Sequence, residues 1–406
     1  MTHTGRKPET LLITLSGKDR PGVTHAVFAA LSGAGVEVID LEQIVLRRRL
    51  ILGVLVTAPR NLAKVRASVE ETAAALDMSV EIERGVGDNK ARRDGRSHVT
   101  IIGTPLRASA MAAVAGRIAD AGANIDRIER MARYPVTAIE LHVSGADTDA
   151  LRSLVAVEAA RQGVDIAVQP ANLLRRGTRL IVMDVDSTLI QGEVIEMLAA
   201  HAGCEAEVAA ITESAMRGEI DFEESLRSRV RLLEGVDAKA LDDVYDAIVL
   251  APGARTLVRT LRRLGYRFAI VSGGFSQITD RLAADLGIHF SRANELEIAD
   301  GVLTGRILGP VVDRAGKAAA LREFAAEIGV LEEATIAIGD GANDLDMLNA
   351  AGLGIAYNAK PLVRDAADTA VNVPYLDAIM YLLGISREEI EAADRAAGFV
   401  TPSPPV

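Results

Sequence analysis

Aromatic residues and cysteine are scarce in this sequence, and their scarcity excludes several kinds of protein. The 406 residues include no tryptophan, one cysteine and only 3% aromatic residues. With Cys204 alone, no disulfide can form within the chain, which favours a reducing compartment such as the cytoplasm. Few aromatic rings are present on which nucleic-acid bases could stack. A formal net charge of -11 also argues against nucleic-acid binding, because such surfaces are basic.

Long apolar runs are missing as well. No uninterrupted apolar run reaches the roughly 18 residues that a membrane-spanning helix needs. The first residues, MTHTGRKPET, lack the apolar stretch of a signal peptide. The remainder has 49% hydrophobic and 25% charged residues, an ordinary composition for two or three globular domains. We therefore expect a cytoplasmic protein that binds neither nucleic acid nor a membrane.

The N-terminal half contains an internal repeat. GAGVEVIDLEQ (33–43) and DAGANIDRIER (120–130) align with Gly35 on Gly122, an offset of 87 residues. Each segment follows a strand-like run and an amphipathic helix, and each precedes two further strand-like runs. This period predicts two ferredoxin-like βαββαβ units, over 10–84 and 98–172, joined by a polar, glycine-containing linker.

The first unit resembles an ACT domain, a small-molecule sensor, because DRPGV (19–23) follows its first strand. Singly, Asp19 and Gly22 are explained equally well as a turn and a helix cap. The second copy has TPLRAS in place of DRPGV and is the more degenerate match. The resemblance implies an amino-acid effector, such as serine, and a homodimer. Its contacts would be Asp19 and Gly22 of the first copy and Asn124 and Asp126 of the second.

The pattern changes over residues 179–385. The apolar runs RLIVMDVD, YRFAIVSGG, ATIAIGDG and LGIAYN alternate with helical stretches. Strands that are apolar on both faces and separated by helices predict an α/β fold with a doubly wound, Rossmann-like parallel sheet. Ligands of such sheets bind at the carboxyl ends of the strands.

The motif DVDST follows the first of these strands and places two carboxylates close together. Residues two apart in an extended segment point to the same side, so Asp184 and Asp186 can reach one site. Close like charges separate two pKa values, so one carboxylate can be ionised while the other is protonated. A Mg²⁺ ion would offset the remaining repulsion. A structural turn capped by aspartate is the alternative.

Three further clusters follow in sequence order. In IVSGGF, Ser272 and Gly273 precede a helix, where backbone N–H groups can bind an anion. Lys317 lies near the start of a helix, against the macrodipole, although the residue on its own is better explained as a solvated surface lysine. In GDGANDLDML, Asp340 and Asp344 suit a metal site or, alternatively, an acidic first helical turn.

The order of these four clusters resembles that of the haloacid-dehalogenase-like phosphotransferase family over residues 179–385. The resemblance implies that Asp184 attacks phosphorus, while Asp186 protonates the leaving alkoxide and then activates water. It also implies a set of supporting residues. These are Asp184, the Asp186 backbone carbonyl and Asp340 as Mg²⁺ ligands, Ser272, Gly273 and Lys317 on the phosphoryl oxygens, and Asn343 and Asp344 as supports of metal and phosphate.

A helical insertion, about 194–250, is expected to cap this site. Phe222 and Arg229 fall on one helix face, where Arg229 either packs its stem or binds a buried carboxylate. The insertion resembles the cap of the phosphoserine phosphatase family. That resemblance implies that Glu193 binds a substrate ammonium and Arg229 its carboxylate, with Arg227 as a competitor for the second role. Met216 and Phe222 would line the pocket.

The expected function is Mg²⁺-dependent hydrolysis of O-phosphoserine, the last step of serine biosynthesis, with amino-acid feedback through the ACT domains. A related enzyme acting on another small phosphomonoester, such as phosphothreonine or a sugar phosphate, is one alternative. A sensor that has lost activity is the other. The intact set of Asp184, Asp186, Lys317 and Asp340 argues against the sensor.

Overall fold

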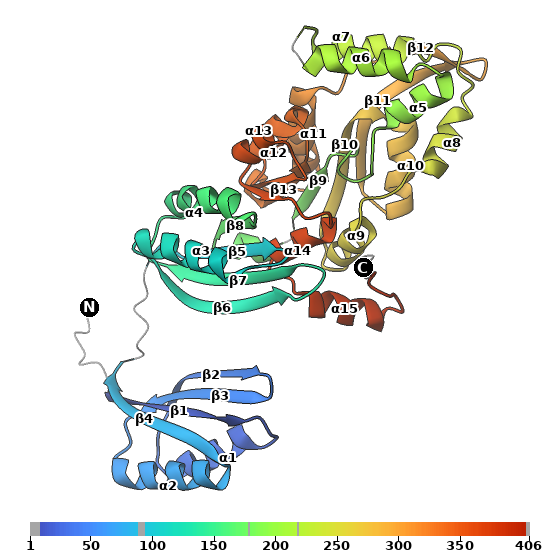
Figure 1. Ribbon diagram of the computed structural model, residues 1–406. Helices are drawn as coiled ribbons and strands as arrows, with labels where there is room; N and C mark the ends of the chain where they lie inside the picture. The colour runs from blue at the N-terminus through green and yellow to red at the C-terminus, as the bar shows by residue number, and fades with distance from the viewer. Residues whose placement is uncertain (1–8, 88–93, 178, 217–218, 403–406) are drawn as a thin grey trace. The chain divides into compact units, whose positions relative to one another are not determined.

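The computed structural model describes residues 9–87, 94–177, 179–216 and 219–402. The chain divides into two compact units, residues 1–92 and 93–406. The elements of each unit are shown in Figure 1.

The first unit is one antiparallel sheet covered by two helices. Alternate residues of its first strand, such as Leu11 and Ile13, are fully buried and pack in one core with helical Val27 and Val69. The strand order is β2-β3-β1-β4, as expected for a βαββαβ unit. The elements are β1 (Glu9–Lys18), α1 (Val23–Ser32), β2 (Val38–Leu46), β3 (Arg49–Thr57), α2 (Leu62–Ala75) and β4 (Met78–Val86).

The second unit begins with another sheet of the same topology, ordered β6-β7-β5-β8. The aligned glycines Gly35 and Gly122 both follow a helix in a left-handed conformation, with φ of 62° and 73°. The predicted duplication of the βαββαβ fold is therefore confirmed. The elements are β5 (Ser97–Gly103), α3 (Ala108–Asp120), β6 (Asn124–Ala132), β7 (Thr137–Ser144), α4 (Thr148–Gln162) and β8 (Asp165–Pro170).

The third sheet has seven strands in the order β12-β11-β10-β9-β13-β14-β15. All neighbours pair in parallel except β11 and β12. The predicted doubly wound parallel sheet is confirmed, although the sequence analysis missed the β11–β12 hairpin and the short β15. The strands are β9 (Leu180–Met183), β10 (Arg267–Phe275), β11 (Phe290–Ala299), β12 (Val302–Leu308), β13 (Thr335–Gly339), β14 (Leu353–Tyr357) and β15 (Thr369–Val371).

Helices cover both faces of this sheet, because β9 is apolar on both sides. Its Leu180 and Val182 share a core with α11 (Arg314–Glu327) and α12 (Leu345–Ala350). Ile181 and Met183 point to the other face and share a core with α9 (Ala254–Arg263) and α10 (Ser276–Leu286). β9 is thereby fixed in the middle of the sheet, between β10 and β13.

Four helices occupy the stretch between β9 and α9 where the cap was expected. They are α5 (Val194–Ala202), α6 (Glu205–Met216), α7 (Phe222–Arg231) and α8 (Ala240–Ala247). Figure 1 shows α5, α6 and α7 grouped at the end of the seven-stranded sheet that is opposite to the β5–β8 sheet. No helix among the described residues is both long and apolar enough to cross a lipid bilayer.

The β5–β8 sheet packs directly on the seven-stranded domain. Its outer-face residues Ile102, Ala138 and Ala167 belong to the same apolar core as Leu376. Hydrogen bonds also join the two parts, since the Asn372 backbone N–H and side-chain amide both donate to Asp165 of β8, at 2.8 and 2.7 Å. These two parts of the second unit therefore form one continuous body.

Candidate active site

Three neighbouring strands deliver the polar motifs to one edge of the seven-stranded sheet. Asp184 follows β9, Ser272 lies near the end of β10, and Asp340 follows β13. The Asp184 N–H donates to the Ile338 carbonyl at 2.9 Å, which continues the parallel pairing of β9 and β13 up to this edge of the sheet. Ser187 then adopts a left-handed conformation, with φ of 58°, and turns the chain sharply after the two aspartates.

A buried ion triad lies at the centre of the site. The Lys317 ammonium is 2.6 Å from Asp184 Oδ1 and 2.7 Å from Asp344 Oδ1. All three residues are almost completely buried, with Lys317 only 1% exposed. Burial opposes the charge of Lys317, but Asp184 and Asp344 outweigh it and raise the lysine pKa above its ordinary value. Lys317 is therefore a charged interior residue and not a solvated surface lysine.

Asp184 and Asp186 have different surroundings. Burial and the charge of Asp344 raise the pKa of Asp184, while the ammonium of Lys317 opposes that rise. Asp186 contacts neutral donors instead, accepting the Val194 N–H at 2.8 Å and the Ser272 hydroxyl at 3.0 Å. Burial raises the pKa of Asp186, and these two donors only partly offset the rise. The pair can therefore hold one ionised and one protonated carboxyl group.

Carboxylate oxygens of Asp184, Asp340 and Asp344 lie within 4.8 Å of one another. Asp340 Oδ1 accepts the Thr188 hydroxyl at 3.0 Å, and burial together with Asp344 raises the pKa of Asp340 to about 6. One lysine balances only one of these three charges. Oxygen ligands and the surplus of negative charge suit a hard divalent cation such as Mg²⁺. The Asp186 side chain is not in this group, and its predicted metal contact is the backbone carbonyl.

The C-terminal residues of β10 are shaped by close contacts. The Ser272 hydroxyl accepts the Gly274 N–H at 2.7 Å. A Cβ added at Gly273 would lie 3.0 Å from the Phe222 ring, so a larger residue here would press on the first turn of α7. Buried Asn294, on β11, holds this end of β10 in place by donating to the Gly273 carbonyl at 2.8 Å.

Two half-buried charged residues, Glu193 and Arg229, lie near the site without ionic partners in the described chain. Burial, followed by the charge of Asp186, raises the pKa of Glu193 to about 7. Burial lowers the pKa of Arg229, while the charges of Glu193 and Asp186 oppose that shift, so the guanidinium lies near these two carboxyl groups. Its one hydrogen bond is a 3.4 Å contact with the Ser225 carbonyl of its own helix. Arg227, in contrast, is paired with Glu223 on the helix surface at 2.7 Å.

The remaining predicted pocket residues are less completely described. Phe222 is the first residue of α7 and is half-buried, with its ring close to Gly273. Asn343 is half-buried, and its side-chain oxygen lies over Gly341. Met216 is the last residue of α6, and its side chain lies outside the described part of the chain.

The predicted effector residues are held by local contacts. Gly22 caps α1 with φ of 94°, and the backbone N–H of exposed Asp19 donates to the Arg48 carbonyl at 2.7 Å. In the second copy, the Asn124 amide donates to Asp126 at 2.8 Å. Their role in effector binding stays a prediction.

Two residues of the site escaped the sequence analysis. Thr188, which binds Asp340, belongs to the DVDST motif and could have been found from its position beside the aspartates. Asn294 supports two segments at once, because its oxygen also accepts the Val312 N–H at 2.8 Å. No motif surrounds Asn294, so only the folded arrangement of β10 and β11 identifies it.

Comparisons with known proteins agree with this architecture. Residues 9–83 and 96–169 each match an ACT domain family, and residues 181–349 match the haloacid dehalogenase-like hydrolases. The chain is 60% identical to the phosphoserine phosphatase of Streptomyces coelicolor, over 96% of this chain and 95% of that protein. It is 52% identical to phosphoserine phosphatase SerB2 of Mycobacterium tuberculosis, over 95% of each.

The chain is also similar to solved structures of related proteins. A haloacid dehalogenase family hydrolase from Salmonella enterica matches with a TM-score of 0.63 and 30% identity, over 71% of this chain and 98% of that one. The unliganded probable phosphoserine phosphatase of Vibrio cholerae matches with a TM-score of 0.58 and 34% identity, over 74% and 88% of the two chains.

The surplus charge at Asp340 leads to a stability prediction. The pKa of Asp340 in the folded protein, about 6, exceeds the value of about 3.9 for an unfolded chain, so ionised Asp340 destabilises the metal-free fold at neutral pH. We expect Asp340→Asn to raise the free energy of unfolding by about 1–3 kcal/mol at pH 7.5 in EDTA. The gain should shrink as the pH falls below 6, where folded wild-type Asp340 binds a proton.

Urea unfolding with and without Mg²⁺ measures this effect. Mg²⁺ should stabilise the wild type more than the variant, because Asp340→Asn removes a ligand. A variant that is less stable than the wild type in EDTA, yet equally stabilised by Mg²⁺, would contradict the assignment of Asp340 to the metal group.

Proposed function

The chain belongs to the phosphoserine phosphatase family, and we propose that it hydrolyses O-phosphoserine to serine and phosphate through an aspartyl-phosphate intermediate. The observation that carries this proposal is the pair of half-buried charges Glu193 and Arg229, which have no ion pair among the described residues and lie near Asp186. A zwitterionic amino acid carries the two charges that would complete this pair.

The proposed chemistry follows from the bonds around each aspartate. Lys317 binds Asp184 Oδ1, which leaves Oδ2 to attack phosphorus while the bond from phosphorus to the seryl oxygen breaks. Protonated Asp186 donates its proton to that oxygen and releases serine. Asp186 then takes a proton from a water molecule, whose oxygen attacks phosphorus, displaces Asp184 and forms inorganic phosphate.

Charge on the phosphoryl group is balanced by the chain and by a cation. Lys317, the Ser272 hydroxyl and the Gly273 N–H are the proposed contacts of the phosphoryl oxygens, with Asn343 beside them. Mg²⁺ fits the carboxylates of Asp184 and Asp340 with the Asp186 carbonyl, and when bound it supplies positive charge for the transferring group. Asp344 holds Lys317 in place behind this group.

The substrate class follows from the cap. The Arg229 guanidinium would form two parallel hydrogen bonds with the substrate carboxylate, and Glu193 would bind the ammonium. Phe222 and Met216 are the proposed pocket walls. A sugar phosphate offers neither charge, so it would cover Glu193 and Arg229 without supplying a counter-charge, which is costly. An amino-acid phosphomonoester is therefore favoured over the other phosphomonoesters, and a complete ion triad speaks against an inactive sensor.

The ACT domains are proposed to bind an amino acid, with serine as the first candidate because it is the reaction product. Asp19, Gly22, Asn124 and Asp126 are the proposed contacts, and a homodimer would bring copies of these loops together. Cys204 is a free thiol, which suits a reducing compartment such as the cytoplasm.

Phosphate release from O-phosphoserine tests the proposed reaction. We expect turnover with Mg²⁺, none after EDTA, and a loss of at least about 1,000-fold in kcat for Asp184→Asn, because an amide cannot act as the nucleophile. Full turnover by Asp184→Asn would refute the aspartyl-phosphate mechanism.

Substrate selection is tested at Arg229, with Arg227 as the matched control. We expect Arg229→Ala to lower kcat/KM for O-phosphoserine by about 100-fold or more, since the substrate carboxylate loses a buried charged partner. Turnover of p-nitrophenyl phosphate, which has no carboxylate, should change little. Arg227→Ala should stay within about twofold of wild type, because its partner Glu223 is on the surface. Unchanged phosphoserine kinetics in Arg229→Ala would exclude the carboxylate contact.

Serine titration addresses the ACT domains. We expect serine to change the initial rate at saturating substrate, and Asp19→Ala and Asn124→Ala to weaken this response without changing the rate in the absence of serine. A serine response that both variants retain would rule out these loops as the effector site.

A further inference from the structure

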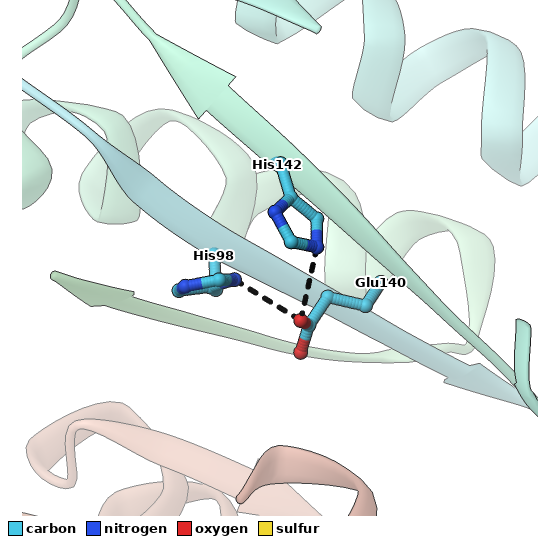
Figure 2. A group of neighbouring side chains, drawn as sticks. All are labelled: His98, Glu140 and His142. Carbon is cyan, nitrogen blue, oxygen red and sulfur yellow. Dashed lines mark ion pairs between the residues drawn. The ribbon is translucent and has the colours of Figure 1, made fainter. Parts of the chain in front are cut away.

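Two histidines and a glutamate converge on the outer face of the β5–β8 sheet. His98 on β5 is directly opposite His142 on β7, and Glu140 is opposite Thr100 one pleat further along. Because alternate residues of a strand share a face, all three side chains lie on the face opposite to α3 and α4. Figure 2 shows both imidazole rings directed at the Glu140 carboxylate.

Two of the distances between these groups are close to those of ligands around one ion. His98 Nδ1 is 3.0 Å and His142 Nε2 is 3.4 Å from the same oxygen, Oε1 of Glu140. The three ligand atoms lie within 4.8 Å of one another. Zinc sits about 2.0–2.2 Å from nitrogen and oxygen ligands, which places neighbouring ligands of a tetrahedral site roughly 3.3 Å apart.

Burial raises the pKa of Glu140, and close contacts with His142, His98 and Arg175 outweigh it, but the two histidine contacts are poorly aligned as hydrogen bonds. His98 Nδ1 and His142 Nε2 are both buried, and neither makes a hydrogen bond of acceptable geometry with a residue of the described chain. The rings meet edge to face at 72°, with centroids 4.6 Å apart. Buried ring nitrogens that approach a carboxylate oxygen without aligning an N–H bond on it are oriented as metal ligands are.

We infer that His98, Glu140 and His142 form a Zn²⁺ site in the second ACT domain, separate from the oxygen-only acidic group of the catalytic site. Two imidazoles and one carboxylate are ligands typical of zinc, whereas Mg²⁺ prefers oxygen alone. A water molecule or Glu129, whose carboxylate is 3.9 Å from His142 Nε2, completes four ligands.

Neighbouring residues support the ligands as outer-shell partners do in metal sites. The Arg175 guanidinium binds the Glu140 carboxylate and fixes its orientation. Arg175 also donates to the Leu382 carbonyl at 3.1 Å, and Gln169, the neighbour of His98 on β8, donates to the same carbonyl at 2.7 Å. The zinc site therefore lies where the second ACT domain is joined to the catalytic domain, and occupation of the site stabilises that junction.

Zinc binding to the full chain tests this inference. Metal-free protein is titrated with Zn²⁺ against a chromophoric chelator, with excess Mg²⁺ to occupy the catalytic group. Wild type should bind one equivalent of Zn²⁺, and Co²⁺ in its place should give the visible absorption bands of a tetrahedral site. His98→Ala and His142→Gln should each weaken Zn²⁺ binding by about 100-fold or more. His201→Ala, which removes an exposed histidine of α5, is the matched control and should bind as wild type does.

A thermal readout separates ligand loss from misfolding. Zn²⁺ should raise the Tm of wild type and His201→Ala but not that of the two ligand variants, whose metal-free Tm should stay near that of metal-free wild type. The inference is overturned if wild type binds no Zn²⁺ in excess Mg²⁺. It is equally overturned if the folded His98→Ala and His142→Gln proteins bind Zn²⁺ as tightly as wild type.

Discussion

The active site depends on one buried ammonium shared by two aspartates. Three separate segments supply these residues, Lys317, Asp184 and Asp344. None of the three is exposed enough for water to solvate its charge. Removing one partner of such a group would leave a buried charge unpaired, at a cost of about 3–5 kcal/mol. These three segments, the start of α11, the end of β9 and the turn after β13, must therefore keep their relative positions. The same geometry determines which oxygen of Asp184 is not bound to Lys317.

The need for counter-charges also distinguishes the roles proposed for the other charged residues. Lys317 balances one carboxylate of the acidic group, and the surplus on Asp340 calls for a cation. Asp186 lies outside the ion triad and contacts only neutral donors, which suits a proton carrier. Glu193 and Arg229 follow the same principle, since each is half-buried without an ionic partner among the described residues and each is complementary to one charge of an amino acid. In the proposed function, catalysis and substrate selection rest on charges that only the complex with substrate and cation would balance.

Much of this arrangement could be predicted from the sequence, because the apolar runs identify the central strands and the motifs follow their carboxyl ends. The duplication was visible through Gly35 and Gly122, since a left-handed turn is needed at the same point of each copy. Periodicity alone could not decide whether Arg229 packs its stem or binds a carboxylate, because that choice depends on the groups that the folded chain brings near its guanidinium. Asn294 and the pairing of His98 with His142 also escaped prediction, because they depend on strand register between segments far apart in sequence.

The central claim is that Asp184 carries the phosphoryl group during turnover. Acid quenching of the enzyme with O-phosphoserine and Mg²⁺, followed by digestion and mass spectrometry, tests it most directly. The account predicts a phosphorylated peptide that contains Asp184, present during turnover and absent from Asp184→Asn. Steady release of phosphate with no phosphorylated peptide, or with the phosphoryl group on another residue, would contradict it.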